Sequence, residues 1–255
     1  MKSENREKSL IGITMGDPGG IGPEVILKAL TSPEIRAAAN YVVIGSEKVL
    51  SNISDRVLTD NISVLDLDNF TVNNALSHKP LPDSGKASVE YILKGLDLAI
   101  NGKIDALVTA PISKEAIKLA GYNYAGHTEL LKEKTSVENV VMFMVGKGLR
   151  VSFVTTHLAV NEISGAINQE NVFSTIQITA TGLKTFFGID QPKIAVCGLN
   201  PHCGDGDRFG TEERDVIIPA IERAQKMGIN CHGPLSADTV FNKALNGEFD
   251  IVIVQ

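Results

Sequence analysis

The chain has 255 residues, 43% of them hydrophobic and 21% charged, which is typical of a folded globular protein with one large α/β core or two smaller ones. Its net charge of −6 comes without a basic face or an arginine-rich tract, and tryptophan is absent, so we expect no nucleic-acid partner. The amino-terminal segment contains neither a secretory core nor a spanning helix, so we expect no membrane association. Three cysteines without metal-type spacing are expected to be reduced thiols in the cytoplasm.

Short apolar runs rich in valine and isoleucine alternate with amphipathic helical patterns along the chain. The runs predict strands at Leu10–Met15, Tyr41–Gly45, Ile104–Thr109, Val140–Val145, Arg150–Thr155, Lys193–Gly198 and Asp250–Val254. Helices are predicted at Pro23–Ala29, Ser88–Asn101, Ser113–Ala120, Glu129–Lys134, Glu170–Phe187, Thr211–Met227 and Ala237–Asn246. Nearly continuous apolar strands between amphipathic helices indicate an α/β/α architecture, with sheets covered on both faces.

Two α/β lobes are predicted, the first over residues 1–125 and the second over residues 126–255. The glycine-rich segment Gly121–Gly126 is the best candidate for a crossing between them. The region Ser51–Pro82 has a weaker pattern and ends in a turn-rich stretch, so it predicts no regular element.

Polar residues follow the ends of several predicted strands. In an open α/β sheet these exits gather along one edge, so their side chains could converge on one cleft. The segments are Thr14–Glu24, Thr109–Lys114, Thr155–His157 and Gly198–His202, together with Gly126–Glu129 at the start of a helix.

Two glycine-rich segments resemble known ligand loops without matching them. Gly16–Gly22 lacks both the Gly-Lys-[Ser/Thr] ending of a phosphate loop and the spacing of a dinucleotide fingerprint. We interpret it as a tight strand-to-helix turn, with Pro23 at the first helical position. Gly204–Gly210 lacks the ligands of a calcium loop. The segment could be either a glycine-rich loop that covers a ligand or a solvated turn.

His157 and His202 each follow a predicted strand, so their imidazoles could meet at a metal ion. The alternative is that both are hydrogen-bonded structural residues, because a catalytic metal usually takes three protein ligands and no clear third is present. His78 and His232 stand in less patterned segments and are interpreted as structural or exposed.

His127 stands at the start of a predicted helix, where backbone N–H groups favour anions. With Thr128 it could bind a substrate carboxylate or phosphate, although either Thr128 or its neighbour could instead cap the helix. Lys114 could bind phosphate or be a solvated residue of a first turn. No nucleophile elbow or supported Cys/His pair is present, which disfavours nucleophilic hydrolysis.

Six segments together resemble the 4-hydroxythreonine-4-phosphate dehydrogenase family of pyridoxal phosphate biosynthesis. They occur in the family's order between Ile13 and Phe241, nearly the whole chain. The segments are ITMGDPGGIGPEV, VTAPISK, GHTE, VTTHLAV, CGLNPHCGDGDRFGTEE and GPLSADTVF.

The resemblance implies a two-lobed α/β/α fold like that of isocitrate and isopropylmalate dehydrogenases, and a homodimer whose active site is shared across the interface. It implies that His157 and His202 are catalytic metal ligands and that His127 and Thr128 bind substrate. The implied metal is zinc or another divalent ion such as magnesium or cobalt. The implied reaction oxidises 4-phosphooxy-L-threonine with NAD or NADP to a 2-amino-3-oxo acid, which decarboxylates to 3-amino-2-oxopropyl phosphate. The nicotinamide contacts are not placed.

In the family that this chain resembles, the strand that matches Asp250–Val254 continues into a His-Asp-Gln segment, whose histidine is the third metal ligand. Later elements there are expected to complete the first lobe. We therefore expect the 255-residue chain alone to bind metal weakly and to turn over little substrate. The alternatives are a 4-phospho-D-threonate or 4-phospho-D-erythronate dehydrogenase, a phosphate acyltransferase of related fold, and a truncated fragment without activity.

Overall fold

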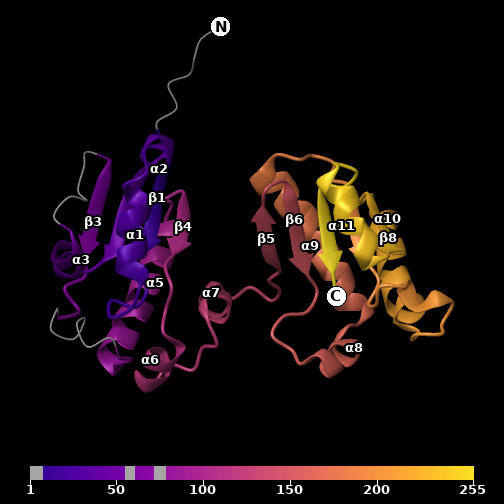
Figure 1. Cartoon of the computed structure of the whole chain (residues 1–255), viewed down its shortest axis with the longest axis horizontal. Coiled ribbons are helices and arrows are strands. Elements are labelled where there is room, and N and C mark those ends of the chain that lie inside the picture. The colour runs from indigo at the N-terminus through magenta and orange to yellow at the C-terminus, as the bar shows by residue number, and fades with distance from the viewer. Residues whose placement is uncertain (1–7, 55–60, 72–78) are drawn as a thin grey trace, which may run out of the picture. The chain divides into compact units, whose positions relative to one another are not determined.

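The computed structural model describes residues 8–54, 61–71 and 79–255, and His78 lies outside them. The chain forms two compact units, Met1–Ser136 and Val137–Gln255, and each is described by itself (Figure 1). Helix α7 (His127–Thr135) belongs to unit 1, because its Leu130 is buried against Val89, Ile92 and Ile117. The units therefore divide after α7, whereas the predicted division at residue 125 lies before this helix.

Unit 1 is built on a parallel four-stranded sheet in the order β3-β2-β1-β4. Its strands are β1 (Leu10–Thr14), β2 (Asn40–Gly45), β3 (Ile62–Asp66) and β4 (Ala106–Thr109). Its helices are α1 (Gly22–Leu30), α2 (Pro33–Ala38), α3 (Glu47–Ile53), α5 (Pro82–Ile100), α6 (Lys114–Leu119) and α7. The strands are short apolar segments, and each connection returns the chain to the same edge of the sheet, as parallel pairing requires.

The long helix α5 lies close to the sheet of unit 1. A Cβ at its Gly95 would stand 2.6 Å from Cδ1 of Leu107 and 3.0 Å from Cγ2 of Thr14, so a larger residue would require these side chains to shift. Helix α1 contributes Ile26 and Leu30 to the main core of the unit. The sheet and its helices thus fix where the exits of β1 and β4 lie.

Unit 2 is built on a five-stranded sheet in the order β5-β6-β9-β7-β8, in which only the β5–β6 pair is antiparallel. Its strands are β5 (Met142–Gly146), β6 (Leu149–Phe153), β7 (Ile194–Cys197), β8 (Cys231–Leu235) and β9 (Ile251–Val254). Its α-helices are α8 (Ile163–Ala166), α9 (Gln169–Phe187), α10 (Ile218–Lys226) and α11 (Ala237–Leu245). Three shorter helical segments are η1 (Val160–Glu162), η2 (Cys203–Asp205) and the π-helical η3 (Glu213–Ile217).

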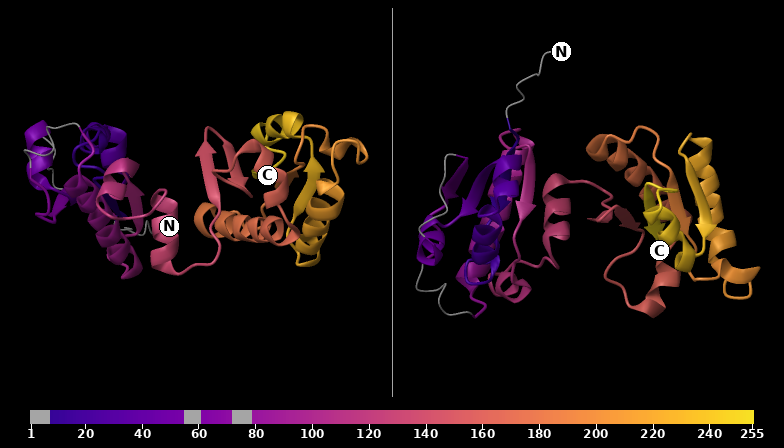
Figure 2. Two further views of the ribbon diagram at one scale, coloured as in Figure 1. Left: turned by 90° about the horizontal axis from the view of Figure 1, so that it is seen from below. Right: turned by 45° about the horizontal axis from the view of Figure 1, so that its top comes forward.

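Alternate residues of the central strands of unit 2 face opposite layers of helices. Ile194 and Val196 of β7 pack in the core that contains α9 and α10, whereas Ala195 and Cys197 pack with α11. Figures 1 and 2 show α9 and α11 on opposite sides of this sheet. This period-2 alternation under two helical layers explains why β7 and β9 are apolar at every position. The predicted α/β fold with parallel sheets is confirmed.

Several elements were not predicted because their local signals are weak. Strand β8 contains Gly233 and Pro234 and lies at an edge of its sheet, where proline is tolerated. Strand β3 is an edge strand within the region Ser51–Pro82 that predicted no element. Helices α2 and α3 are only six and seven residues long. Over the described ranges, no helix is long and apolar enough to cross a bilayer.

Candidate functional site

The exits of β1 and β4 are joined in unit 1 by a backbone contact that requires glycine. The strands pair in parallel, and the N–H of Asp17 donates to the carbonyl of Pro111 at 3.0 Å. Gly16 has φ of +73°, and a Cβ there would stand 2.2 Å from that same carbonyl oxygen. A side chain at this position would therefore force the two exits apart.

The segment between β1 and α1 forms a tight turn around the buried side chain of Asp17. The Asp17 carboxylate accepts the N–H of Gly19 at 2.8 Å, and only 6% of the residue is exposed. Helix α1 begins at Gly22, where a Cβ would stand 2.2 Å from the carbonyl oxygen of Met15, and Pro23 lies in its first turn. The predicted strand-to-helix turn is confirmed, but Pro23 is the second helical residue and not the first.

His127 lies against the exit of β4 as the first residue of α7. Its ring lies close to the backbone of Ala110, the residue after β4. Its Nε2 atom is buried and has no hydrogen-bond partner among the residues that the structure describes. Burial lowers the pKa of His127, and the nearby backbone of Ala110 opposes this effect in part. The imidazole is therefore neutral at pH 7 and has one free ring nitrogen.

We predict that the His127 resonance in an NMR titration has a midpoint below 6.5, the usual value for histidine. Because the folded-state pKa is lowered, the neutral ring contributes stability that is fully present above pH ~6.5 and is lost as the pH falls through the lowered pKa. The variant His127→Gln should remove both the resonance and this part of the acid dependence of unfolding. A midpoint at or above 6.5 contradicts the burial argument.

Thr128 and Lys114 occupy different environments in unit 1. Thr128 is exposed next to His127, and the residue at the cap position of α7 is Gly126, without a side-chain bond. The alternative that Thr128 caps the helix is therefore wrong. Lys114 is the exposed first residue of α6, which Ser113 caps by accepting the N–H of Ala116 at 3.2 Å.

His157 and His202 follow strands that end at one edge of the sheet of unit 2. Strands β6 and β7 both run parallel to β9, which lies between them, so the exits of all three strands share that edge. Both histidines are exposed, and His157 has φ of +61°. Non-glycine residues with positive φ are uncommon and cluster at functional sites.

Asn200 organises the loop that carries His202. Its Oδ1 atom accepts the N–H of His202 at 2.9 Å and that of Gly204 at 3.3 Å, while its Nδ2 atom donates to the carbonyl of Phe209 at 3.2 Å. The ring of His202 lies with its centroid 5.9 Å from that of Phe209. Hydrogen bonds from the side chain of Asn200 thus hold the loop together. Asn200 lies within the predicted strand exit Gly198–His202, but no signal in the sequence marks its role.

Neither unit presents a complete metal site in the part of the chain that the structure describes. There, no three His, Cys, Asp or Glu side chains are close enough together to hold a metal ion. His157 and His202 are donors of the type that zinc prefers, but they are fewer than the three protein ligands usual at a catalytic site.

The cysteines are free thiols, and two of them are poor nucleophiles. Burial raises the pKa of Cys197 to about 12 and that of Cys231 to about 11. Burial also raises the pKa of Cys203, which lies beside His202 in sequence. These thiols are protonated at neutral pH, which agrees with the absence of a supported Cys/His pair in the sequence.

His232, interpreted as structural or exposed, is an exposed residue near the start of β8. Its Nε2 atom lies 2.8 Å from Oδ1 of Asn230, and its ring lies near that of Phe249. Because β8 runs parallel to β7, the start of β8 lies at the edge opposite the exit of β7. His232 is therefore outside the candidate site.

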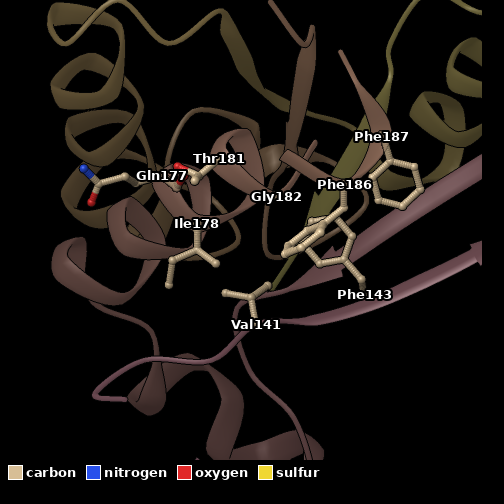
Figure 3. Close-up of a pocket in the computed structure, with 8 residues that line it drawn as sticks. All are labelled: Val141, Phe143, Gln177, Ile178, Thr181, Gly182, Phe186 and Phe187. Carbon is tan, nitrogen blue, oxygen red and sulfur yellow. Dashed lines mark hydrogen bonds between the residues drawn. The ribbon is translucent and has the colours of Figure 1, made fainter. Parts of the chain in front are cut away.

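A separate groove in unit 2 has a volume of about 570 Å³ and is mostly apolar (Figure 3). It lies over β5 and α9, and none of its lining residues is titratable, so it is not a place for acid–base chemistry. Phe186 is 83% exposed there. The lining residues are Val141, Phe143, Gln177, Ile178, Thr181, Gly182, Phe186 and Phe187.

Comparison with known proteins gives consistent matches over nearly the whole chain. Residues 26–255 match the family described as "Pyridoxal phosphate biosynthetic protein PdxA". The chain is 41% identical to the 4-hydroxythreonine-4-phosphate dehydrogenase of Desulforapulum autotrophicum, over 96% of this chain and 77% of that protein. It is also 41% identical to an Oceanobacillus iheyensis protein named for D-threonate 4-phosphate dehydrogenase activity, over 97% of this chain and 80% of that protein.

A solved structure supports the same match. The 4-hydroxythreonine-4-phosphate dehydrogenase from Burkholderia phymatum aligns with this chain at a TM-score of 0.85 and 36% identity. The alignment covers 98% of this chain and 80% of that one.

Proposed function

We propose, from the membership of this chain in the PdxA family of pyridoxal phosphate biosynthesis, that it is the dehydrogenase of 4-phosphooxy-L-threonine. The secondary alcohol is oxidised by NAD⁺ or NADP⁺, which accepts the hydride while the hydroxyl proton is released. The resulting 2-amino-3-oxo acid loses CO₂ to give 3-amino-2-oxopropyl phosphate. The observation that carries the proposal is 41% identity to a relative of that name over 96% of the chain.

His157 and His202 are proposed as the residues at the reacting carbon of the substrate. Their position supports this role, because both are exposed at the edge of the sheet where the parallel strands of unit 2 end. We further propose that they are two of the ligands of a divalent metal, zinc, magnesium or cobalt. Such an ion would acidify the substrate hydroxyl when bound.

His127 and Thr128 are proposed to bind an anionic group of the substrate, its carboxylate or its phosphate. The free Nε2 atom of His127 supports this, since a buried ring nitrogen without a partner is a ready contact for a ligand. The neutral ring can gain a proton when an anion binds, because a nearby negative charge raises the pKa of histidine. The N–H groups at the start of α7 add to the attraction.

The proposed organisation is that of a two-lobed dehydrogenase like isocitrate and isopropylmalate dehydrogenases, acting as a cytoplasmic homodimer with a shared site. Exposed apolar side chains of β5 and α9 support the dimer, among them Met144, Val145 and Phe186. Exposed apolar patches of this kind mark contacts between proteins. The mass of the protein in solution, measured by light scattering, decides the point.

The second candidate function is oxidation of 4-phospho-D-threonate or 4-phospho-D-erythronate. It is favoured by the Oceanobacillus iheyensis relative, whose 41% identity equals that of the first relative. These substrates share the phosphate and the carboxylate and differ at the carbon that bears the amino group. A panel of the three substrates at equal concentration, followed by NAD(P)H absorbance, separates the two candidates.

We expect 4-phosphooxy-L-threonine to give the highest kcat/KM in this panel. If either amino-free acid is faster, the first proposal is wrong and the second is right. Turnover of none of the three, with either cofactor, overturns both. The panel should use the protein at its natural length.

A further inference from the structure

The carboxylate of Glu213 lies buried inside the loop that carries His202. Glu213 is 5% exposed and begins the π-helical segment η3, an irregular helix of a type frequent at functional sites. Its Oε1 atom accepts the N–H of Leu199, two residues after the end of β7, at 2.8 Å. Its Oε2 atom is buried without a hydrogen-bond partner in the described part of the chain. Burying a charged carboxylate costs free energy unless the charge is paired or hydrogen-bonded, so we expect this burial to serve a specific role.

Two glycines leave room for this carboxylate. A Cβ at Gly198 would stand 2.8 Å from Oε1 of Glu213, and one at Gly204 would stand 3.0 Å from Oε2. Gly198 precedes the loop and Gly204 lies within it, so the carboxylate is held between the two ends of the segment that contains His202. The backbone there departs from ordinary geometry, since Cys203, Gly204 and Asp205 all have positive φ.

We infer that Glu213 is a positioning residue, which fixes the segment Leu199–Gly210 around its carboxylate and so orients His202 toward the substrate. The inference rests on the proposed role of His202. Asn200 holds the segment from within through its bonds to His202 and Phe209, whereas Glu213 anchors it to the helical layer of unit 2. Removing the carboxylate should loosen this segment while the sheet and α9 stay intact.

The test compares Glu213→Ala and Glu213→Gln with the exposed control Glu222→Ala on α10, in the protein at its natural length. Hydrogen exchange followed by mass spectrometry reports the loop, and steady-state kinetics report kcat and KM. In Glu213→Ala we expect peptides from 199–210 to exchange at least about tenfold faster, with peptides of α9 unchanged. We expect kcat to fall about a hundredfold and KM to change far less. The amide of Glu213→Gln retains an acceptor for Leu199 and should recover much of both.

Unchanged exchange of 199–210 in Glu213→Ala overturns the inference. Faster exchange throughout unit 2 also overturns the inference, because the carboxylate would then stabilise the whole unit. Faster exchange of the loop with an unchanged kcat overturns it as well. If the unmodified protein turns over no phosphorylated hydroxy acid, the proposed function fails instead. The exchange data then still decide whether Glu213 fixes the loop.

Discussion

Replacing His202 with alanine should lower kcat/KM for 4-phosphooxy-L-threonine by about a thousandfold, which corresponds to ~4 kcal/mol of lost transition-state stabilisation. We expect this loss because the imidazole of His202 is proposed to act at the reacting carbon of the substrate. His202 is exposed, and the loop bond to Asn200 uses its backbone N–H, so the alanine variant should keep the loop and the fold. Steady-state kinetics together with thermal unfolding measure both effects.

The matched control is His232→Ala, which removes another exposed imidazole of unit 2 from the opposite edge of the sheet. This variant should keep both its activity and its stability. Metal content per chain, measured by mass spectrometry of the elements, should fall in His202→Ala and not in the control. Equal kinetic losses in both variants, or none in His202→Ala, would refute the assignment of His202.

Replacing Gly85 with alanine should destabilise unit 1 by about 3 kcal/mol, since overpacking against backbone costs 1–3 kcal/mol and sometimes more. Gly85 lies in α5, and a Cβ there would stand 2.0 Å from the carbonyl oxygen of Ala116 in α6. Helix propensity alone predicts the opposite sign, because alanine is favoured over glycine by about 1 kcal/mol inside a helix. The backbone collision is the larger effect, so α5 and α6 must separate.

Tyrosine fluorescence during urea unfolding measures this change selectively. The chain has no tryptophan, and its four tyrosines, Tyr41, Tyr91, Tyr122 and Tyr124, all belong to unit 1. The control is Lys86→Ala, which places alanine at the next, exposed position of α5. It should alter the free energy of unfolding by no more than about 0.5 kcal/mol. A Gly85→Ala variant as stable as the parent contradicts the close packing of α5 and α6.

Much of the fold could be predicted because buried parallel strands leave a strong signal. Strands β7 and β9 are apolar at every position, since helices cover both faces of their sheet. Strand β8 has no such run, and its Gly233 and Pro234 resemble a turn. Its place in the sheet depends on pairing with β7, which is distant in sequence.

The candidate site was predictable only where residues follow strands directly. His157 and His202 share a sheet edge because parallel strands end together, a rule that can be applied to the sequence. Glu213 could not be found in this way. Its burial depends on the space left by Gly198 and Gly204, and in sequence it is one of two adjacent acidic residues that resemble a solvated helix start. The roles of His127, Thr128, His157 and His202 stay predictions.

Release of CO₂ during NAD(P)⁺ reduction tests the central claim most directly. With 4-phosphooxy-L-threonine as the substrate, the protein at its natural length should form one CO₂ for each NAD(P)H, and neither without the other. Absorbance follows the reduced cofactor, and a labelled carboxyl group follows CO₂. Absence of both products, or reduction of the cofactor without CO₂, would contradict the account of this chain as the oxidising and decarboxylating dehydrogenase.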